Sequence, residues 1–512
     1  MLVKVFASAV FGIDATIVTA EVSVTKGLKF YLVGLPDNAV KESYHRMDHA
    51  IAGCGLYFPR GKRTVINLAP ADVHKEGSAY DLPMAVGILA STKQVPAERL
   101  GEFVIMGELS LDGGVRPIKG ALPIAIEARD RGFKGVIVPK ANAREAGIVN
   151  GLTVFGVEHL REVIAILHGE PTVSPERVDI RAEFEQASAV YPIDLSDVRG
   201  QENIKRAFEI AAAGGHNIIL IGPPGAGKTM LAKRLPTIMP PLDLDEALET
   251  TKIHSVAGKL GRSDSLLSTR PFRSPHHTIS DVALVGGGSF PQPGEISLAH
   301  NGVLFLDELP EFKRTVLEVL RQPLEDRIVT ISRARFTVEY PASFMLVASM
   351  NPCPCGFYNH PEKECVCAPG VVQKYLNKIS GPLLDRIDIH IEVTPVPFSE
   401  LSAERGQERS LDVRERVIRA RSVQQERYRG QGIHCNAQMS AQQLRAICRI
   451  DAAGKALLEK AMDRLGLSAR AYDRILKVAR TIADMAESPV IRTEHLAEAI
   501  QYRSLDREGW AG

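Results

Sequence analysis

Residues 217–229 read Asn-Ile-Ile-Leu-Ile-Gly-Pro-Pro-Gly-Ala-Gly-Lys-Thr, an apolar run followed at once by a glycine-rich loop. The loop fits the phosphate-binding pattern G-x-x-x-x-G-K-S/T, and residues 230–235 are expected to continue it as a helix. Backbone amides of such a loop surround phosphate oxygens, and the dipole of the helix start attracts the anion. The stretch therefore predicts an α/β nucleotide-binding core. Its candidate residues are Gly222, Pro223, Pro224, Gly225, Ala226, Gly227, Lys228 and Thr229.

A second apolar run, residues 302–306, ends in the carboxylates Asp307 and Glu308. It predicts a buried strand whose carboxyl end faces the nucleotide. Lys228 would reach the β- and γ-phosphates of ATP, while the Thr229 hydroxyl and Asp307, the latter through water, would hold Mg²⁺. Glu308 would polarise the attacking water. The alternative is that the two carboxylates form a solvated strand end.

Composition limits the class of protein. The chain has 512 residues, enough for about three domains. Lys and Arg number 62 and Asp and Glu 61, which gives a net charge of +1 and excludes a uniformly basic nucleic-acid coat but not a local basic surface. No apolar run reaches the ~18 residues of a membrane span, and the alternating apolar and polar residues of the start are expected to form strands and not a signal peptide. Seven cysteines, four of them close together, argue against a disulfide framework and for a cytoplasmic protein.

Four segments differ in their patterns. Residues 1–168 mix short β-like runs with helical stretches and predict an α/β or α+β domain. Residues 169–193 are proline-containing and charged, as in a linker. Residues 194–397 form the nucleotide-binding core, and residues 398–512 predict a helical lid. Strands are expected at 16–24, 29–33, 65–68 and 135–139 in the first domain and at 217–221, 302–306 and 344–349 in the core, with helices at 83–91 and 122–131.

The cysteine cluster consists of two C-x-C pairs, Cys353 with Cys355 and Cys365 with Cys367. Four thiolates this close in sequence suit a tetrahedral Zn²⁺ site, although C-x-C is less common than C-x₂-C in such sites. A redox-active thiol pair and four metal-free loop cysteines are the alternatives.

Two segments near the acidic strand are candidates for gripping a substrate. Residues 327–340 contain two β-branched runs around Ser-Arg-Ala-Arg, which predicts a hairpin with a basic tip. Arg333 and Arg335 at that tip could meet phosphates with salt-sensitive affinity, or the hairpin could simply be solvated. Residues 273–290 are glycine-rich and irregular, and their His276 and His277 are candidate ligands or catalytic residues or, more often for such a pair, structural.

These motifs resemble those of AAA+ ATPases, specifically the magnesium-chelatase-like ComM/YifB family, over essentially the whole chain. The resemblance implies that Asn351 is the sensor that orients the attacking water. It implies that Arg386 is an arginine finger donated to a neighbouring subunit, and that Arg470 is the second sensor, on the lid. Planar guanidinium groups match the charged oxygens of the phosphoryl transition state, and a finger acting in trans requires a ring, most often a hexamer. Alternatively, Arg386 is a surface ion-pair residue, and Arg474, one helical turn from Arg470, competes for the lid role.

The resemblance extends to the other segments. In this branch of AAA+ proteins the basic hairpin and the glycine-rich insertion face a central pore. Residues 1–168 resemble the Lon-protease-like fold, but the position of the serine nucleophile holds Ala79, Ser78 is one residue displaced, and residues 121–133 contain no lysine. This domain is therefore expected to be non-proteolytic and to serve DNA binding or ring assembly.

Together these features predict a hexameric, Mg²⁺-dependent ATPase that acts on single-stranded or branched DNA. The resemblance implies helicase activity and branch migration during integration of DNA in natural transformation. The residues themselves indicate only ATP hydrolysis and a basic hairpin. The alternatives are the motor subunit of a magnesium chelatase, which the Lon-like domain and the cysteines disfavour, and a protein-remodelling ring, which the arginine-rich hairpin disfavours.

Overall fold

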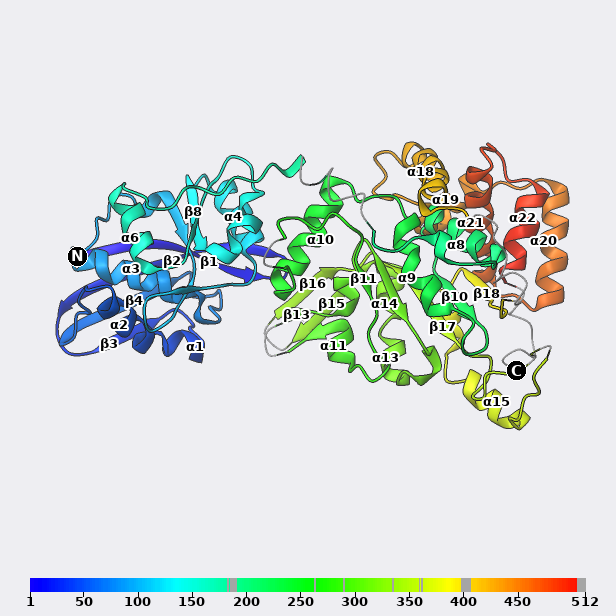
Figure 1. Cartoon of the computed structure of the whole chain (residues 1–512), viewed down its shortest axis with the longest axis horizontal. Coiled ribbons are helices and arrows are strands. Elements are labelled where there is room, and N and C mark those ends of the chain that lie inside the picture. Colours follow the sequence, from blue (N-terminus) through cyan, green and yellow to red (C-terminus); the bar gives the residue numbers. More distant parts are fainter. Residues whose placement is uncertain are drawn as a thin grey trace.

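The computed structural model describes residues 1–181, 184, 191–261, 264–288, 291–333, 336–358, 360, 362–396 and 407–503. Figure 1 shows an elongated molecule in which the N-terminal domain, the nucleotide-binding core and the helical lid follow one another along the long axis. In the described part of the chain, no helix is both long and apolar enough to span a membrane.

The N-terminal domain is built on a seven-stranded mixed sheet with the order β3-β4-β2-β1-β5-β8-β9. Its α3 (Asp81–Ser91) is buried along its whole length and packs on β1 and β2, which explains its continuous apolar sequence. The predicted strands and helices of this domain are present. The strands are β1 (Leu2–Phe11), β2 (Asp14–Lys26), β3 (Phe30–Val33), β4 (Lys62–Ala69), β5 (Phe103–Ile105), β8 (Gly135–Pro139) and β9 (Thr153–Val157), with a small β6 (Glu108–Leu109)–β7 (Val115–Arg116) ribbon; the other helices are α1 (Asn38–Lys41), α2 (Ser43–Gly53), α4 (Ala121–Asp130), α5 (Lys140–Gly147) and α6 (Leu160–His168).

The core contains a five-stranded parallel sheet with the order β11-β14-β17-β10-β18. Every residue of β10, β14 and β17 is buried, because helices cover both faces of a parallel sheet. The carboxyl ends of these strands meet at one edge, where open α/β sheets bind their ligands. The strands are β10 (Ile218–Ile221), β11 (Phe272–Arg273), β14 (Val303–Leu306), β17 (Met345–Met350) and β18 (Ile389–Glu392); the helices include α8 (Glu202–Gly214), α9 (Lys228–Ile238) and α10 (Leu244–Ala257).

The insertions of the core are short elements around this sheet. The predicted hairpin is formed by β15 (Ile328–Arg333) and β16 (Phe336–Pro341) in antiparallel register. The turn between β1 and β2 reaches it, because a Cβ placed on Gly12 would lie 3.2 Å from a methyl of Val338 (Figure 1). The remaining short elements are α11 (Asp281–Val285), β12 (Gly286–Gly287), β13 (Gln292–Pro293), α12 (Glu295–Leu298), α13 (Arg314–Glu318), α14 (Arg321–Asp326), α15 (Pro369–Leu376) and α16 (Gly381–Leu384).

The C-terminal helices, the predicted lid, pack against the end of the core that lies opposite the N-terminal domain (Figure 1). Of these, α18 packs against α8 and α9, and α21 packs against α8, so that lid and core share one hydrophobic cluster. The lid helices are α18 (Ser410–Arg427), α19 (Ala441–Ile447), α20 (Ala452–Leu465), α21 (Ala469–Met485) and α22 (Thr493–Gln501). On the other side, Val173, Val178 and Ile180 of the predicted linker pack against the N-terminal core. The α/β core, helical lid and preceding α+β domain agree with the predicted fold class.

Candidate nucleotide-binding site

The phosphate-binding loop joins β10 to α9, as its sequence predicted. Gly227, the residue before α9, has a φ of 83°, a left-handed conformation that costs glycine little. This turn lets residues 222–229 curl around the start of the helix, where unpaired backbone amides and the helix dipole favour a phosphate.

Lys228 lies inside this loop. Its Nζ donates to the carbonyl oxygens of Gly222 at 2.6 Å and Pro223 at 2.9 Å and to Asn351 Oδ1 at 3.1 Å. Burial lowers the pKa of Lys228, and the carboxylates of Asp307 and Glu308 oppose that shift. Asn351 follows β17, so the structure brings the expected sensor to the expected phosphate-binding lysine.

Two oxygen ligands suited to Mg²⁺ meet beside the loop. Thr229 Oγ1 donates to Asp307 Oδ2 at 2.7 Å, across the carboxyl ends of β10 and β14. The hydroxyl of Ser349 donates to the other oxygen of Asp307 and orients the carboxylate. Hydroxyl and carboxylate oxygens are the ligands that Mg²⁺ takes beside nucleotide phosphates, so these residues fit the ion. Ser349 carried no motif, although its place in the strand next to Asp307 could have indicated it.

Glu308 has a backbone conformation unusual for a residue with a side chain. Its φ is 55°, and such left-handed strain concentrates at functional sites. The side chain is 57% exposed, and Glu308 Oε2 lies 3.2 Å from His277 Nδ1. His277 also packs edge-on against Phe312. Of the two histidines whose role the sequence left open, His277 therefore lies next to Glu308, the candidate general base.

The two arginines implied by the resemblance differ in their surroundings. Arg386 is 5% exposed, and its Nη2 lies 2.6 Å from Glu325 Oε1 of the same chain. It would have to leave this ion pair to reach a neighbouring subunit. Arg470 is 59% exposed, and its Nη1 lies 3.8 Å from Asp385 Oδ2. Arg470 is therefore the more accessible of the two.

A buried network connects the Arg386 segment to the lid. Asp388 accepts from Arg474 Nη1 at 3.0 Å and from the backbone amide of Asn217 at 3.0 Å, and it lies 3.5 Å from His216 Nδ1. Burial would raise the pKa of Asp388, but Arg474 and His216 outweigh it and hold the pKa well below its ordinary value. Arg474, the competitor for the sensor role, is engaged here in a structural ion pair.

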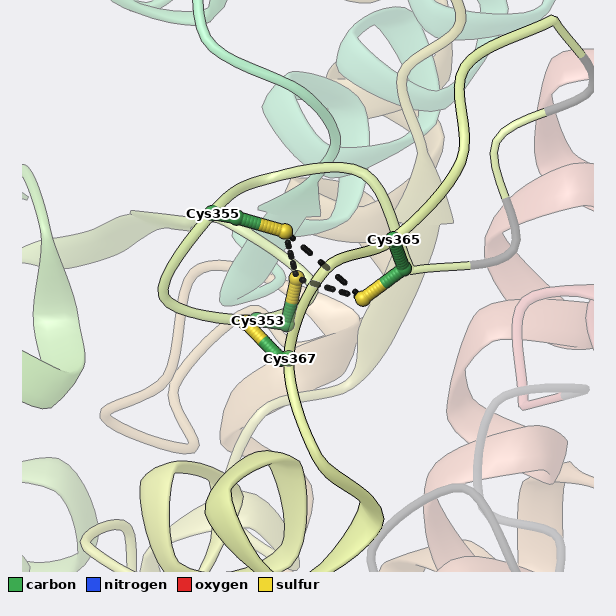
Figure 2. Close-up of side chains that lie close together, drawn as sticks. All are labelled: Cys353, Cys355, Cys365 and Cys367. Carbon is green, nitrogen blue, oxygen red and sulfur yellow. Dashed lines mark hydrogen bonds between the residues drawn. The ribbon is translucent and has the colours of Figure 1, made fainter.

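The four cysteines of the predicted cluster lie together. Their sulfur atoms all fall within 4.8 Å of one another, and Figure 2 shows Cys353, Cys355 and Cys365 pointing toward a common centre. The amide of Tyr358 donates to Cys353 Sγ at 3.3 Å. Hydrogen bonds, above all from the Phe357 amide and also from Cys353 and the Val366 amide, lower the pKa of the Cys355 thiol to about 6, whereas burial and the neighbouring thiols raise the pKa of Cys365 and Cys367. Such amide–sulfur bonds are the support that thiolate ligands need.

Two other segments singled out in the sequence are the basic hairpin tip and the nucleophile segment of the Lon-like domain. The side chain of Arg333 and the whole of Arg335 lie outside the described residues. In the N-terminal domain, Ser78 donates to the carboxylate of Glu108, and the buried Lys75 donates to the Pro70 carbonyl. A serine nucleophile needs a base such as lysine, so these pairings do not resemble an activated Ser–Lys dyad.

Comparison with known proteins agrees with this geometry. Family profiles for the magnesium chelatase subunit ChlI match residues 194–401, residues 20–142 and, as its C-terminal part, residues 407–503. The chain is 45% identical to the uncharacterized protein YifB of Escherichia coli over 98% of this chain and 96% of that protein. It is 44% identical to the competence protein ComM of Haemophilus influenzae over 99% and 98%. A part of the chain, 36%, is 29% identical to Lon protease 2 of Bacillus subtilis over 32% of that protein.

These matches confirm the predicted resemblance. The nucleotide-binding loop, the acidic strand end and the lid fall inside the matched segments, and the family implies ATPase activity. The chain belongs to the ComM/YifB family of magnesium-chelatase-like AAA+ proteins.

Proposed function

We propose that this chain is an Mg²⁺-dependent ATPase that assembles into a homohexameric ring and moves along single-stranded or branched DNA. In this function it drives unwinding or branch migration as incoming DNA is integrated during natural transformation. The convergence of Lys228, Thr229, Asp307 and Asn351 at one edge of the sheet carries the ATPase part. The DNA part has the support of a relative over nearly its full length that is named a competence protein.

The chemistry is divided among these residues. Lys228 and the amides at the start of α9 bind the phosphates, and Thr229 and Asp307 hold Mg²⁺, which neutralises charge on the phosphate oxygens when bound. Glu308 orients the attacking water and accepts its proton. His277, at 3.2 Å, holds the Glu308 carboxylate in place.

Two arginines complete the site in the assembled ring. Arg386 of one subunit would leave Glu325 and stabilise the charged transition state at its neighbour, and Arg470 would approach from the lid. Guanidinium groups suit this role because they stay charged and bind two oxygens at once.

A basic and aromatic surface of the N-terminal domain supports DNA as the partner. The ends of β2 and β4 are paired, with Lys26 opposite Lys62. The Arg63 guanidinium lies 5.4 Å from the ring of Tyr31, and the Lys62 ammonium lies 5.9 Å from the ring of Tyr57. Both rings are exposed. Cations that bind phosphates beside rings that stack on bases are the usual elements of single-strand binding. The net charge of +1 therefore coexists with a local positive surface.

The proposal includes a zinc ion at Cys353, Cys355, Cys365 and Cys367. The four sulfurs lie close enough to share one ion. Zinc would supply a fixed tetrahedral cross-link in a segment of irregular backbone.

The similarity to magnesium chelatase subunits favours a second candidate function, that of a chelatase motor or a protein-remodelling ring. The matched profiles describe a magnesium chelatase subunit, and the chain is 26% identical to the magnesium-chelatase 67 kDa subunit of Heliobacterium mobile over 33% of this chain. A chelatase motor or a protein-remodelling ring would hydrolyse ATP without responding to DNA.

The deciding experiment measures ATP hydrolysis by the full chain at low salt without DNA, with single-stranded DNA and with a four-way junction. Stimulation and junction movement are expected, and both should be absent in Lys228→Ala. DNA binding should weaken in Lys62→Glu, with a less steep salt dependence. The control Lys134→Glu changes an exposed lysine already paired with Glu102 and should bind normally. ATP turnover with no DNA binding would refute the DNA motor, and no turnover would refute the ATPase.

A further inference from the structure

The four-cysteine centre has the dimensions of a tetrahedral metal site. The Cys353 and Cys355 sulfurs are 3.3 Å apart, those of Cys353 and Cys365 3.7 Å, and those of Cys355 and Cys365 3.6 Å. A zinc ion with bonds of ~2.3 Å places its sulfurs about 3.8 Å apart. These three thiols therefore need to move little to take up the ion, and the Cys367 sulfur lies within 4.8 Å of each of them. All four are free of disulfides.

The first half of this centre touches the phosphate-binding loop directly. Gly356 follows Cys355, and its amide donates to the Cys353 carbonyl at 3.0 Å to close a tight turn. Gly356 has a φ of 85°, and a Cβ built on it would lie only 2.4 Å from Cδ of Pro224. A contact this close leaves no room for a side chain. The turn that holds two of the four sulfurs is thus packed against the middle of the loop that binds phosphate.

The segment leading into the turn makes two more connections to the same loop. The amide of Gly222 donates to the carbonyl of Met350 at 3.2 Å. Lys228 Nζ donates to Asn351 at 3.1 Å. Residues 350–356 therefore contact the beginning, the middle and the end of the phosphate-binding loop.

The described residues between β17 and α15 form no helix or strand. Their conformation depends on what holds the sulfurs together, since a chain without regular hydrogen bonding gains freedom when a cross-link is removed. A bound metal would restrict both halves of the segment at once.

We propose that a zinc ion bound by the four cysteines acts as a clamp that holds the phosphate-binding loop in its nucleotide-binding shape, so that zinc occupancy sets the affinity for ATP. This inference rests on the zinc site and the ATPase of the proposed function. On binding, the thiols release their protons to solvent as four Zn–S bonds form, and no electron is transferred. The clamp acts through Gly356 and Pro224, so the metal is not part of the reaction.

The first test uses the full-length protein with its zinc counted by mass spectrometry. A zinc-selective chelator in excess Mg²⁺ and reductant removes the ion, and binding of a fluorescent ATP analogue is measured before removal, after it and after adding zinc back. About one zinc per chain, a roughly tenfold or greater loss of affinity and its recovery are expected. No bound zinc, or unchanged affinity after removal, overturns the proposal.

The second test separates the clamp from the metal. Gly356→Ala keeps all four thiols but forces the turn and Pro224 apart, so zinc should stay near one per chain while ATP affinity falls. Gly430→Ala is the matched control, because Gly430 also has a left-handed φ, 74°, and a Cβ there meets nothing within 4 Å. Equal ATP affinity in the two variants overturns the clamp. If Gly356→Ala does not fold, Cys365→Ser tests the link between zinc and affinity instead: it should lose both, and normal ATP affinity without zinc overturns the proposal.

The outcomes separate this inference from the proposed function. If the chain binds about one zinc and hydrolyses ATP, but its ATP affinity does not change when zinc is removed, the clamp alone is refuted. A zinc-loaded wild-type chain without ATP turnover refutes the proposed function.

Discussion

The buried ion pair between Asp388 and Arg474 allows a quantitative prediction. Asp388 is 1% exposed and receives hydrogen bonds from Arg474 and from the backbone of Asn217. Asp388→Asn keeps the shape of the side chain but removes its charge. It leaves the guanidinium of Arg474, which is only 18% exposed, without a counterion.

Breaking a buried ion pair by changing one partner costs about 3–5 kcal/mol. Because Arg474 keeps some contact with water, we expect the lower end, a loss of about 3 kcal/mol in the free energy of unfolding. With a urea dependence of about 2–3 kcal/mol per molar, the midpoint of the transition should fall by about 1 M. Far-UV circular dichroism in urea measures this shift.

Asp385→Asn is the matched control in the same segment. Asp385 lies 3.8 Å from an Arg470 that is 59% exposed, so this change should cost less than about 1 kcal/mol. Adding Arg474→Gln to Asp388→Asn should cost less than the sum of the single changes, because the second partner is already unpaired. If Asp388→Asn and Asp385→Asn lower the free energy of unfolding by the same small amount, the reasoning that burial makes the Asp388–Arg474 pair costly to break is refuted.

Four further outcomes are expected. Glu308→Gln should bind ATP normally but lower kcat by about 10²–10⁴, which phosphate-release assays detect, and normal turnover would remove Glu308 as the base. His277→Ala should lower kcat by roughly tenfold and add nothing to Glu308→Gln; an additive loss would mean that it acts elsewhere. Arg386→Ala should lower kcat by about 10³ or more, and mixing it with Lys228→Ala should restore activity if the finger acts in trans; no restoration would place it in cis. Burial lowers the pKa of His216 in the folded chain, so below about pH 6.5 the unfolded chain binds a proton there that the folded chain does not. The free energy of unfolding should therefore fall on acidification by up to ~1.4 kcal/mol per pH unit. Urea unfolding curves at pH 7 and pH 5.5 that coincide would contradict this expectation.

Local sequence was sufficient to predict the candidate nucleotide-binding site. A phosphate-binding loop is made of consecutive backbone amides at the start of a helix, so residues 222–229 identify it without knowledge of the rest of the fold. The apolar runs at residues 217–221, 302–306 and 344–349 predicted buried parallel strands, and parallel strands bring their carboxyl ends to one edge. The meeting of Thr229 with Asp307 follows from those two regularities.

Contacts between segments far apart in the chain depend on strand order and loop path, which periodicity does not specify. His277 beside Glu308 and Asp388 beside Arg474 are pairs of this kind. Glu308 and Arg474 were singled out in the sequence, but no motif indicated His277 or Asp388 as their partners.

The cysteine cluster depends both on a local motif and on a contact between distant segments. Its composition and spacing by themselves predicted a zinc site, with a redox-active thiol pair and metal-free cysteines as the alternatives. Only the tertiary structure decided that the loop lies on the phosphate-binding loop, through the approach of Gly356 to Pro224. Sequence thus determined which chemical groups the protein has, since chemistry of this kind is local. The packing of the core decided which of them act on one another, since that depends on distances between segments that no local pattern encodes.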